Sequence, residues 1–362
     1  MPPLPRAVAA SRGRRRGPRR ARQPPARGPA PAGSGRASAA PPRSRRHRTD
    51  RRPGRARAGG RPGRGRRGRL RRGTQVPPQA ARSGCLVELM MTRGARNARD
   101  LLRDSRSRAT AALRSRAPLV GYWSVLDSPV STERIARLGY DYVALDAQHG
   151  LLEYAGVLRS LTAIDTKGST AVGLVRVEAV DPAPIGKALD AGAAGVIVPL
   201  IDTAEDAADA VAAVRYPPHG RRSYGPMRSG LRIGPDPADA HAQTVVLAMI
   251  ETAEGLANVE AICATDGLDG VYVGPSDLRI ALGGASSTDP ALADEFEAAL
   301  VSVRTAAAGA GIAAGIHTAD GASAAKRLAE GFTFATVACD LVHLEQAAAG
   351  HLNAARQAGE AR

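Results

Sequence analysis

Two apolar runs that each end in a carboxylate decide the fold of this chain: VVLAMIE (residues 245–251) and GVYVGPSD (residues 270–277). Runs that are apolar on both faces are typical of strands buried in a parallel sheet. A carboxylate at the C-terminal end of each of two such strands is the way in which an α/β barrel presents a divalent metal. Because hard cations such as Mg²⁺ prefer oxygen ligands, Glu251 and Asp277 favour a metal site over a structural role.

The alternation of apolar runs and Ala-rich helical segments extends outward from these two stretches, beginning at residue 117. We expect strands at residues 119–125, 142–146, 171–177, 195–201, 245–251, 270–273, 312–316 and 332–337. Helices are expected between them, at residues 130–138, 153–164, 183–191, 204–214 and 291–308. Eight such units in about 240 residues predict a (β/α)₈ TIM barrel of the α/β class. A doubly wound sheet is the alternative, but no G-x-G-x-x-G motif follows the first strand.

One long segment between the fourth and fifth strands, residues 215–242, shows no clear helix or strand. It is rich in Pro, Gly and Arg. Loops of this length are usually functional lids or interface segments. We therefore expect this segment to act near the active site or between copies of the chain.

The first 89 residues differ in composition from the barrel region, and we expect them to be disordered. They hold 26 Arg, no Lys and two acids, a charge of 26 − 2 = +24, whereas the rest of the chain has 25 − 32 = −7. A tail of Pro, Gly, Ala and Arg cannot bury enough apolar surface to offset chain entropy. Its role stays open between phosphate contacts to nucleic acid, a transit peptide and an inert extension from a misplaced gene start near Met90 or Met91. Nucleic-acid binding is disfavoured, since no aromatic residue before Tyr122 could stack on a base.

The rest of the chain suggests a cytoplasmic protein. Residues 90–116 are predicted as a linker or short helix leading into a barrel of residues 117–362. No apolar span of 18 residues exists, so we expect no membrane helix. The cysteines Cys85, Cys263 and Cys339 have no pairing or metal spacing and fit a reducing compartment.

Polar side chains are concentrated at the C-terminal ends of the predicted strands, where TIM barrels carry their active sites. Charged groups brought together must be compensated, so a hydrophobic core does not explain this convergence. Each candidate also has a structural alternative, such as a loop anchor, a core residue or a partner for a barrel carboxylate, and for His317 that alternative is favoured. In addition to Glu251 and Asp277, the candidate site residues are Trp123, Asp146, His149, Arg176, Asp190 and His317. Asp190 is placed in the last turn of a predicted helix, where an anion opposes the helix dipole and therefore suggests a specific partner.

In this arrangement the residues resemble the HpcH/HpaI aldolase family of the phosphoenolpyruvate/pyruvate-type barrels. The resemblance spans about residues 119–344 and is carried by GYW (121–123), DAQHG (146–150), VRV (175–177), LDAGA (189–193), VP (198–199), RYPPHG (215–220), IET (250–252), GPSDL (274–278) and AKR (325–327). It implies a class II, metal-dependent aldolase that cleaves or forms 4-hydroxy-2-oxo acids, with pyruvate and an aldehyde as the small-molecule partners. It also implies a homo-oligomer, commonly a hexamer (a dimer of trimers) in which the last helix packs on a neighbour.

The resemblance further implies a role for each matching residue. Glu251 and Asp277 would hold Mg²⁺ or Mn²⁺, with Co²⁺ as a further candidate. Arg176 would bind the oxo and carboxylate end of pyruvate, and His149 would move protons with Asp190 orienting it. The residues implied to bind substrate are Trp123, Gly274, Pro275 and Ser276. The backbone N–H groups of Gly274 and Ser276 would donate hydrogen bonds to the pyruvate carboxylate. Asp146 and Gln148 would hold the catalytic residues in place without contacting the substrate.

The chemistry of these residue types agrees with that implication. Breaking a carbon–carbon bond beta to a carbonyl leaves an enolate, whose negative charge a divalent metal and an Arg stabilise. The other aldolase route uses a Lys Schiff base, but none of Lys167, Lys187 and Lys326 falls at the C-terminal end of a predicted strand.

Three positions depart from the family pattern, and two of them, Met249 and Arg279, bear on the aldehyde acceptor. Met249 stands where several members have Gln, and Gln148 stands where members often have Glu. Arg279 replaces a usually small residue and could reach an acidic acceptor or an interface. The alternative function is an acyl-CoA lyase of the malyl- or citryl-CoA type on the same barrel.

Overall fold

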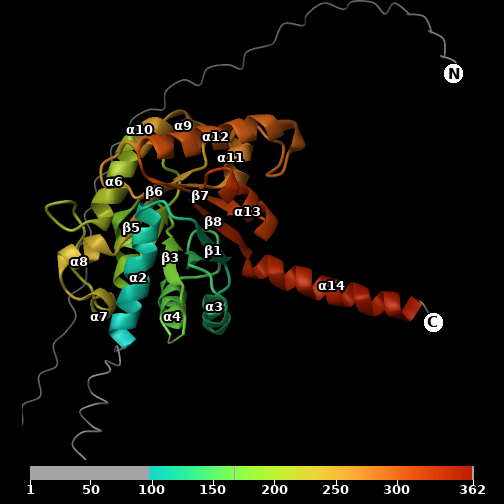
Figure 1. Cartoon of the computed structure of the whole chain (residues 1–362), viewed down its shortest axis with the longest axis horizontal. Coiled ribbons are helices and arrows are strands. Elements are labelled where there is room, and N and C mark those ends of the chain that lie inside the picture. The colour runs from blue at the N-terminus through green and yellow to red at the C-terminus, as the bar shows by residue number, and fades with distance from the viewer. Residues whose placement is uncertain (1–97, 167, 361–362) are drawn as a thin grey trace, which may run out of the picture. The chain divides into compact units, whose positions relative to one another are not determined.

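The computed structural model of this protein describes residues 98–166 and 168–360, and its elements alternate between strands and helices as expected for a β/α barrel (Figure 1). The predictions made for residues 1–89 lie outside the described residues, as does Lys167. None of the helices among the described residues is long and apolar enough to cross a membrane.

Eight parallel strands form a closed barrel, with β1 paired to both β2 and β8. The predicted TIM barrel is therefore confirmed. The strands are β1 (Leu119–Ser124), β2 (Tyr142–Asp146), β3 (Val172–Arg176), β4 (Gly195–Val198), β5 (Val245–Ile250), β6 (Gly270–Val273), β7 (Ala313–Thr318) and β8 (Phe334–Cys339). Two of them, β2 and β6, have the predicted bounds.

The helices that follow the strands run back along the outside of the barrel. They are α3 (Pro129–Ala136), α4 (Tyr154–Ile164), α5 (Pro182–Asp190), α6 (Ala204–Val214), α9 (Ala253–Ala257), α10 (Val259–Cys263), α11 (Pro275–Ala281), η1 (Pro290–Leu292), α12 (Ala293–Gly309) and α13 (Gly321–Ala329). Proline occupies the first position of α3 and of α5. Its missing N–H costs nothing there, because the first N–H groups of a helix have no acceptor within the helix.

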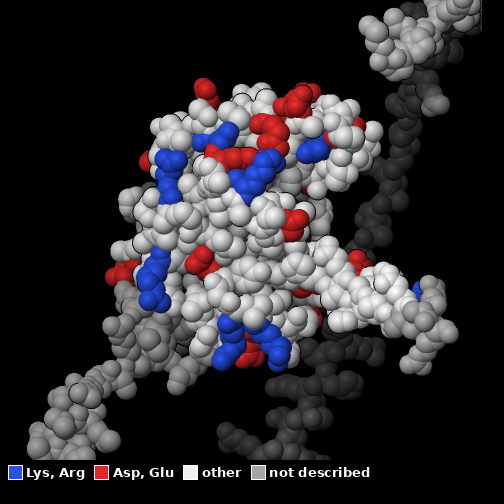
Figure 2. All heavy atoms as spheres, turned by 45° about the vertical axis from the view of Figure 1, so that its right-hand side comes forward, with Lys and Arg blue, Asp and Glu red and all other residues white. Residues whose placement is uncertain are grey.

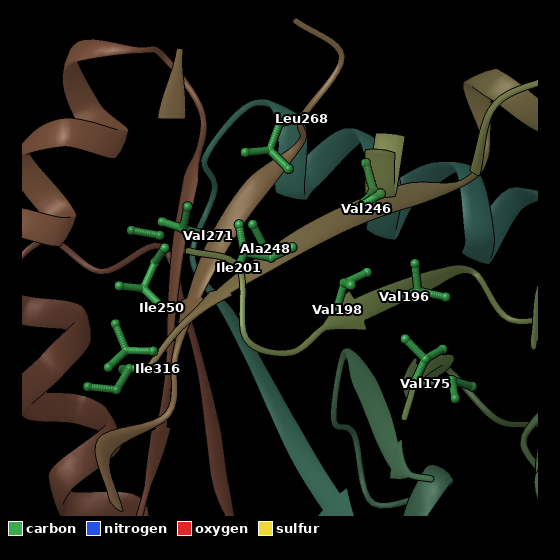
Figure 3. Close-up of a cluster of buried hydrophobic side chains, with 14 of the residues drawn as sticks. Val175, Val196, Val198, Ile201, Val246, Ala248, Ile250, Leu268, Val271 and Ile316 are labelled. Carbon is green, nitrogen blue, oxygen red and sulfur yellow. The ribbon is translucent and has the colours of Figure 1, made fainter. Parts of the chain in front are cut away.

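Two apolar layers hold the barrel together. The outward-facing side chains of the strands pack against the helices, and Figure 3 shows part of this layer, with Val196, Val246 and Val271 among its fully buried members. The interior is filled by a second cluster in which the hydroxyls of Tyr142 and Tyr272 both hydrogen-bond Thr336 Oγ1, at 2.7 and 2.8 Å. A packed interior leaves the C-terminal mouth of the barrel as the place for a site.

The N-terminal end of the barrel is covered by helix α2 (Ala98–Arg114), which corresponds to the short helix expected before the barrel. Its Leu113 joins the interior cluster beside Leu119 and Val245, at the beginnings of two strands. Arg106 is buried and donates hydrogen bonds to the carbonyls of Gly192, Ala193 and Gln243. Burial lowers the pKa of Arg106 to about 10, so the guanidinium stays charged at neutral pH.

The long segment between β4 and β5 contains two short helices, α7 (Gly230–Ile233) and α8 (Pro237–Ala242), so the expectation of no element there was wrong. The segment follows the C-terminal end of α6, and its contacts are with α2 and the beginnings of strands: Arg215 donates to the Thr244 carbonyl at 2.8 Å and pairs with Asp269 at 2.7 Å. It therefore lies at the N-terminal end of the barrel and does not cover the mouth of its own chain.

The last helix, α14 (Asp340–Glu360), projects away from the barrel (Figure 1) and carries few charges on the visible face (Figure 2). Its first residue fixes the junction, because Asp340 accepts hydrogen bonds from Ser124 Oγ at 2.8 Å and from the backbone N–H of Val125 at 2.9 Å. Beyond that anchor the helix leaves apolar side chains exposed, including Leu344 and Leu352 at 60% and 50%.

Candidate active site

A cavity of about 330 Å³ opens at the C-terminal ends of the strands. It is lined by Trp123, His149, Arg176, Met249, Tyr272, Gly274, Pro275, Ser276, Asp277 and His317. A second cavity of about 310 Å³ lies outside the barrel, between α4 and α5, and is lined largely by apolar residues with Lys187 at its edge. The barrel cavity is the candidate site, because charged and polar groups from several strands converge there.

A buried ion pair forms the floor of the barrel cavity. Arg176, the last residue of β3, donates two hydrogen bonds to Asp146, the last residue of β2: Nε to Oδ1 at 2.9 Å and Nη2 to Oδ2 at 2.6 Å. Trp123 Nε1 donates to Asp146 Oδ2 at 3.2 Å, and the Arg176 guanidinium lies 5.0 Å from the Trp123 ring centroid. Burial would raise the pKa of Asp146, but the Arg176 hydrogen bonds and charge outweigh it, so the pKa is lowered.

Asp146 also fixes the loop that carries His149. Its Oδ1 accepts hydrogen bonds from the backbone N–H groups of Gln148 and His149, both at 3.1 Å. The His149 side chain is exposed on the cavity wall, where a substrate proton could reach it. Gln148 keeps its side-chain Oε1 buried without a hydrogen-bond partner. Asp146 therefore contacts both Arg176 and the loop of His149, whereas Gln148 contacts this group only through its backbone N–H.

The two expected metal ligands come from adjacent elements. Glu251 directly follows β5 and is 3% exposed, while Asp277 lies in the first turn of α11 and is exposed. The backbone N–H of Leu200 donates to Glu251 Oε1 at 2.9 Å. Leu200 has a left-handed φ of 54°, a strained conformation for a Leu that aims this N–H at the carboxylate. Nothing in the sequence signalled this contact, because a backbone N–H is present at almost every residue.

The donor set and its charge fit a hard divalent cation. Burial raises the pKa of Glu251, and the negative charges of Asp277 and Asp202 raise it further, against the Leu200 N–H and the charge of Arg176. Among the described residues no group of three or more His, Cys, Asp or Glu side chains converges as a metal cage. Two carboxylates with room for substrate oxygens match the way in which Mg²⁺ is usually held.

The turn before α11 shapes the cavity between the two carboxylates. A Cβ on Gly274 would lie 2.6 Å from Met249 Cε and 2.7 Å from Glu251 Oε2, so a larger residue there would force one or both of these side chains to move. The Gly274 N–H donates to the carbonyl of Ile250 at 3.4 Å, which makes it a weaker candidate for binding a carboxylate than expected. Pro275 has no N–H, and Ser276 keeps the exposed position in the first helical turn.

Asp190 is the expected site residue that the structure does not bring to the cavity. It ends α5, which runs from the C-terminal end of β3 back to the beginning of β4, so its carboxylate lies at the opposite end of the barrel. There its Oδ1 accepts from Arg222 Nη2 at 2.7 Å, and its backbone carbonyl accepts from the N–H of Ser229. Within one chain, Asp190 therefore cannot orient His149.

His317 and Tyr272 also line the cavity, and both pack against the ring of Trp123. The ring of His317, for which the sequence favoured a structural role, meets Trp123 edge-on with the centroids 5.3 Å apart. The ring of Tyr272 stacks on Trp123 with the centroids 5.8 Å apart. Arg279, which could have reached an acidic acceptor, instead lies over the Phe296 ring at 4.2 Å and donates to the Asp289 carbonyl at 3.1 Å.

Comparison with known proteins identifies the group to which this chain is similar. Residues 119–347 match the family model described as HpcH/HpaI aldolase/citrate lyase. A hydroxypyruvate/pyruvate aldolase of Rhizorhabdus wittichii is 43% identical over 232 residues, which cover 64% of this chain and 91% of the relative. A 5-keto-4-deoxy-D-glucarate aldolase of Klebsiella pneumoniae is 38% identical over 234 residues, covering 64% and 90% of the two chains.

A solved structure agrees with these matches. The chain superposes on an HpcH/HpaI aldolase/citrate lyase family protein from Burkholderia cenocepacia with a TM-score of 0.61 and 33% sequence identity, covering 68% of this chain and 98% of the other. The matching region includes every strand of the barrel and all the candidate site residues. The chain is an aldolase-type lyase, and it belongs to the HpcH/HpaI aldolase/citrate lyase family.

Proposed function

We propose that this protein is a class II, metal-dependent aldolase that cleaves or forms 4-hydroxy-2-oxo acids, with pyruvate and an aldehyde as the two halves. The observation that carries the proposal is a cavity lined by Arg176, His149 and Asp277, in which Arg176 is fixed by Asp146. The carboxylate of Glu251 lies beside Gly274, which is part of the cavity wall. An enolate needs electrophilic groups aimed at its oxygen, and Arg176 together with a divalent metal held by the two carboxylates would supply them.

Arg176 is the residue best placed to hold the 2-oxo acid. Its Nε and Nη2 atoms are used by Asp146, which leaves Nη1 to donate to the oxo or carboxylate oxygens of the substrate. Because the guanidinium is held by two hydrogen bonds and by the Trp123 ring, its orientation is set before substrate binds. Ser276 would supply a backbone N–H to the carboxylate on the opposite side of the cavity.

Glu251 and Asp277 would hold the divalent metal, with Mg²⁺, Mn²⁺ and Co²⁺ as the candidate ions. When bound, the metal supplies Lewis-acid polarisation of the oxo group. Gly274 keeps the space beside Glu251 Oε2 open, and the Leu200 N–H holds the other carboxylate oxygen. The hydrogen bond from Leu200 would position Glu251 before the ion arrives.

His149 would take the proton from the hydroxyl of the 4-hydroxy-2-oxo acid as the carbon–carbon bond breaks, and return it in the condensation direction. A His is suited to this because a neutral imidazole nitrogen accepts a proton and the imidazolium can return it. The role expected for Asp190 requires an assembly, in which the Asp190 of another copy approaches the cavity. The exposed apolar side chains of α14, such as Leu344 and Leu352, support the proposal of a homo-oligomer, expected as a hexamer.

The Schiff-base route finds no support among the lysines of the described region. Lys187 lies on α5 at the edge of the outer cavity, 6.0 Å from the Tyr154 ring. Lys326 lies on α13 within 4 Å of Glu297 and Glu330. Neither amine lines the barrel cavity, so neither could reach a carbonyl bound at Arg176.

The proposal is tested by measuring pyruvate release from a panel of 4-hydroxy-2-oxo acids by the full-length protein, with and without EDTA. Release that stops with EDTA and returns on adding Mg²⁺ or Mn²⁺ would support it. Release that EDTA leaves unchanged would refute metal dependence, and no release from any panel member would refute the aldolase activity on free 2-oxo acids.

The alternative is an acyl-CoA lyase on the same barrel, because the family model also covers citrate lyase. The D-x-x-H-G loop at residues 146–150 and the aldolase names of relatives at 36–43% identity favour the free acid. Malyl-CoA and citryl-CoA in the same assay distinguish the two functions.

A further inference from the structure

His317 presents a fixed polar ring to the cavity. It is the fifth residue of β7 and lines the cavity wall. Its ring packs edge-on against Trp123, and Trp123 is itself held by the Tyr272 ring and by its hydrogen bond to Asp146. Rings packed in this way keep one orientation, so the nitrogens of His317 occupy a defined place in the wall.

Those nitrogens are available to a ligand. The ring of His317 contacts Trp123, and its nitrogens make no hydrogen bond within the described residues. Burial and the nearby charge of Arg176 lower the pKa of His317 to about 4, so the imidazole is neutral at physiological pH. A neutral imidazole carries one donor and one acceptor nitrogen, which matches a hydroxyl group and cannot form an ion pair with a carboxylate.

The position of His317 associates it with the aldehyde half of the substrate. Arg176, Glu251 and Asp277 follow β3, β5 and β6, and they hold the 2-oxo acid in the proposed function. His317 and His149 belong to β7 and to the loop after β2, on the other side of the barrel mouth. His149 is the proposed proton acceptor for the aldehyde-derived hydroxyl, so the acceptor lies on the side of these two histidines.

The cavity as a whole offers little to a second negatively charged group. Trp123, Met249 and Tyr272 make much of its lining apolar. Arg279 points away, over Phe296. Arg176, the only Lys or Arg that lines the cavity in the described part of the chain, is already paired with Asp146. A carboxylate at the far end of an aldehyde would therefore lose its hydration without gaining a partner.

We infer that His317 is a specificity-determining residue that hydrogen-bonds the hydroxyl of a short, uncharged 2-hydroxyaldehyde acceptor. The inference rests on the proposed aldolase function and names the substrate class of that site. Binding sites that hydrogen-bond a substrate hydroxyl discriminate strongly against the analogue without it, because the polar group of the protein is then left unpaired.

The test compares 2-hydroxypropanal with propanal, which differ by one hydroxyl, as acceptors for pyruvate in the full-length enzyme with Mg²⁺ or Mn²⁺. The readout is the ratio of the two kcat/KM values, measured by chromatography of the 4-hydroxy-2-oxo acid products. The variants are His317→Leu, which removes both nitrogens, and His317→Gln, which restores a neutral donor and acceptor. Succinic semialdehyde serves as the charged acceptor.

We expect the wild-type enzyme to favour 2-hydroxypropanal by about 10-fold or more, the magnitude of one well-placed hydrogen bond. His317→Leu should bring the ratio to within about 2-fold of unity, and His317→Gln should recover part of it. A purely structural role would slow both aldehydes together and leave the ratio unchanged, which would overturn the inference. A wild-type ratio near unity, or a preference for succinic semialdehyde, would overturn it without touching the aldolase proposal, since propanal would still be condensed. Failure of the wild-type enzyme with every aldehyde would refute the proposed function itself.

Discussion

Replacing Asp146 by Asn should destabilise the barrel strongly, because Asp146 is the counter-charge of a buried guanidinium. Asp146 and Arg176 are 2% and 6% exposed. Removing one partner of a buried ion pair costs about 3–5 kcal/mol, since the other charge stays buried and uncompensated. Asn keeps one oxygen that can accept from Arg176, so we expect the lower end of that range, about 3 kcal/mol.

The chain contains a matched control for this experiment. Arg159 Nη2 lies 2.6 Å from Asp127 Oδ2, the same distance as Arg176 Nη2 from Asp146 Oδ2, but the side chains of the control pair are 54% and 32% exposed. Water screens such a pair, and its loss costs about 0–1 kcal/mol. Asp127→Asn should therefore lower the free energy of unfolding by at most about 1 kcal/mol.

The assay is equilibrium unfolding in urea, followed by circular dichroism for the wild type and both variants under one buffer condition. The two pairs differ in burial and in the number of hydrogen bonds that the Asp accepts, so the gap between the variants measures these two effects together. If Asp146→Asn is no more destabilising than Asp127→Asn, the argument that burial makes this pair costly to break is refuted.

The pH dependence of the stability of Asp146→Asn tests separately whether folding lowers or raises the pKa of Asp146. The pKa of Asp146 is lowered below its ordinary value of 3.8, so ionised Asp146 stabilises the folded state. That contribution is complete above the unfolded pKa, near pH 4, and is lost as the pH falls through the folded value. The stability gap between wild type and Asp146→Asn should thus be constant from about pH 5 to 7 and shrink below about pH 4. A gap that widens on acidification would contradict the lowered pKa.

Three further substitutions test the site. His149→Ala should lower kcat for aldol cleavage by about 10²–10⁴-fold, with metal affinity retained. The control is His351→Ala, at an exposed histidine on α14, which should leave kcat unchanged. Equal rates for the two variants would remove His149 from the mechanism. Glu251→Gln should weaken Mn²⁺ binding, measured by calorimetry, by at least about 10-fold, and full occupancy in this variant would place the metal elsewhere. Gly274→Ala should cost about 1–3 kcal/mol of stability and also weaken Mn²⁺ binding, because its Cβ meets Met249 Cε and Glu251 Oε2 at 2.6 and 2.7 Å. Gly186→Ala, on α5 with nothing within 4 Å of the new Cβ, is its control and should be neutral or slightly stabilising; a Gly274→Ala variant that behaves like it would contradict the steric argument.

The barrel and most of its mouth could be predicted from the sequence because both follow from one periodic pattern. Strands buried on both faces are continuous apolar runs, so the polar residue that ends each run is easily recognised, as at Arg176 and Glu251. All eight strands point the same way, which brings those end residues to one edge of the barrel. Trp123, His149 and Asp277 lie together in the cavity for that reason.

The sequence could not place residues whose surroundings depend on the direction of the chain or on contacts far along it. Asp190 was grouped with the site by its motif, although a residue that ends the helix after β3 lies at the other end of its own barrel, so its predicted role needs a second copy of the chain. The role of Leu200 depends on a left-handed backbone that its side chain disfavours, and no local signal predicts it. The direction of Arg279 is set by Phe296, 17 positions further along the chain, which no short motif contains.

The charges within the cavity favour a cation that binds before the substrate does. Arg176 is matched by Asp146, so its positive charge is not available in full to a third group. Glu251 is buried near the carboxylates of Asp277 and Asp202. Burial and the negative charges of these two groups raise the pKa of Glu251. A metal ion would relieve this repulsion and the cost of burial at once, whereas an anionic 2-oxo acid entering first would add to the repulsion. We therefore expect ordered binding, with the metal first, and Mn²⁺ affinity that is measurable in the absence of pyruvate.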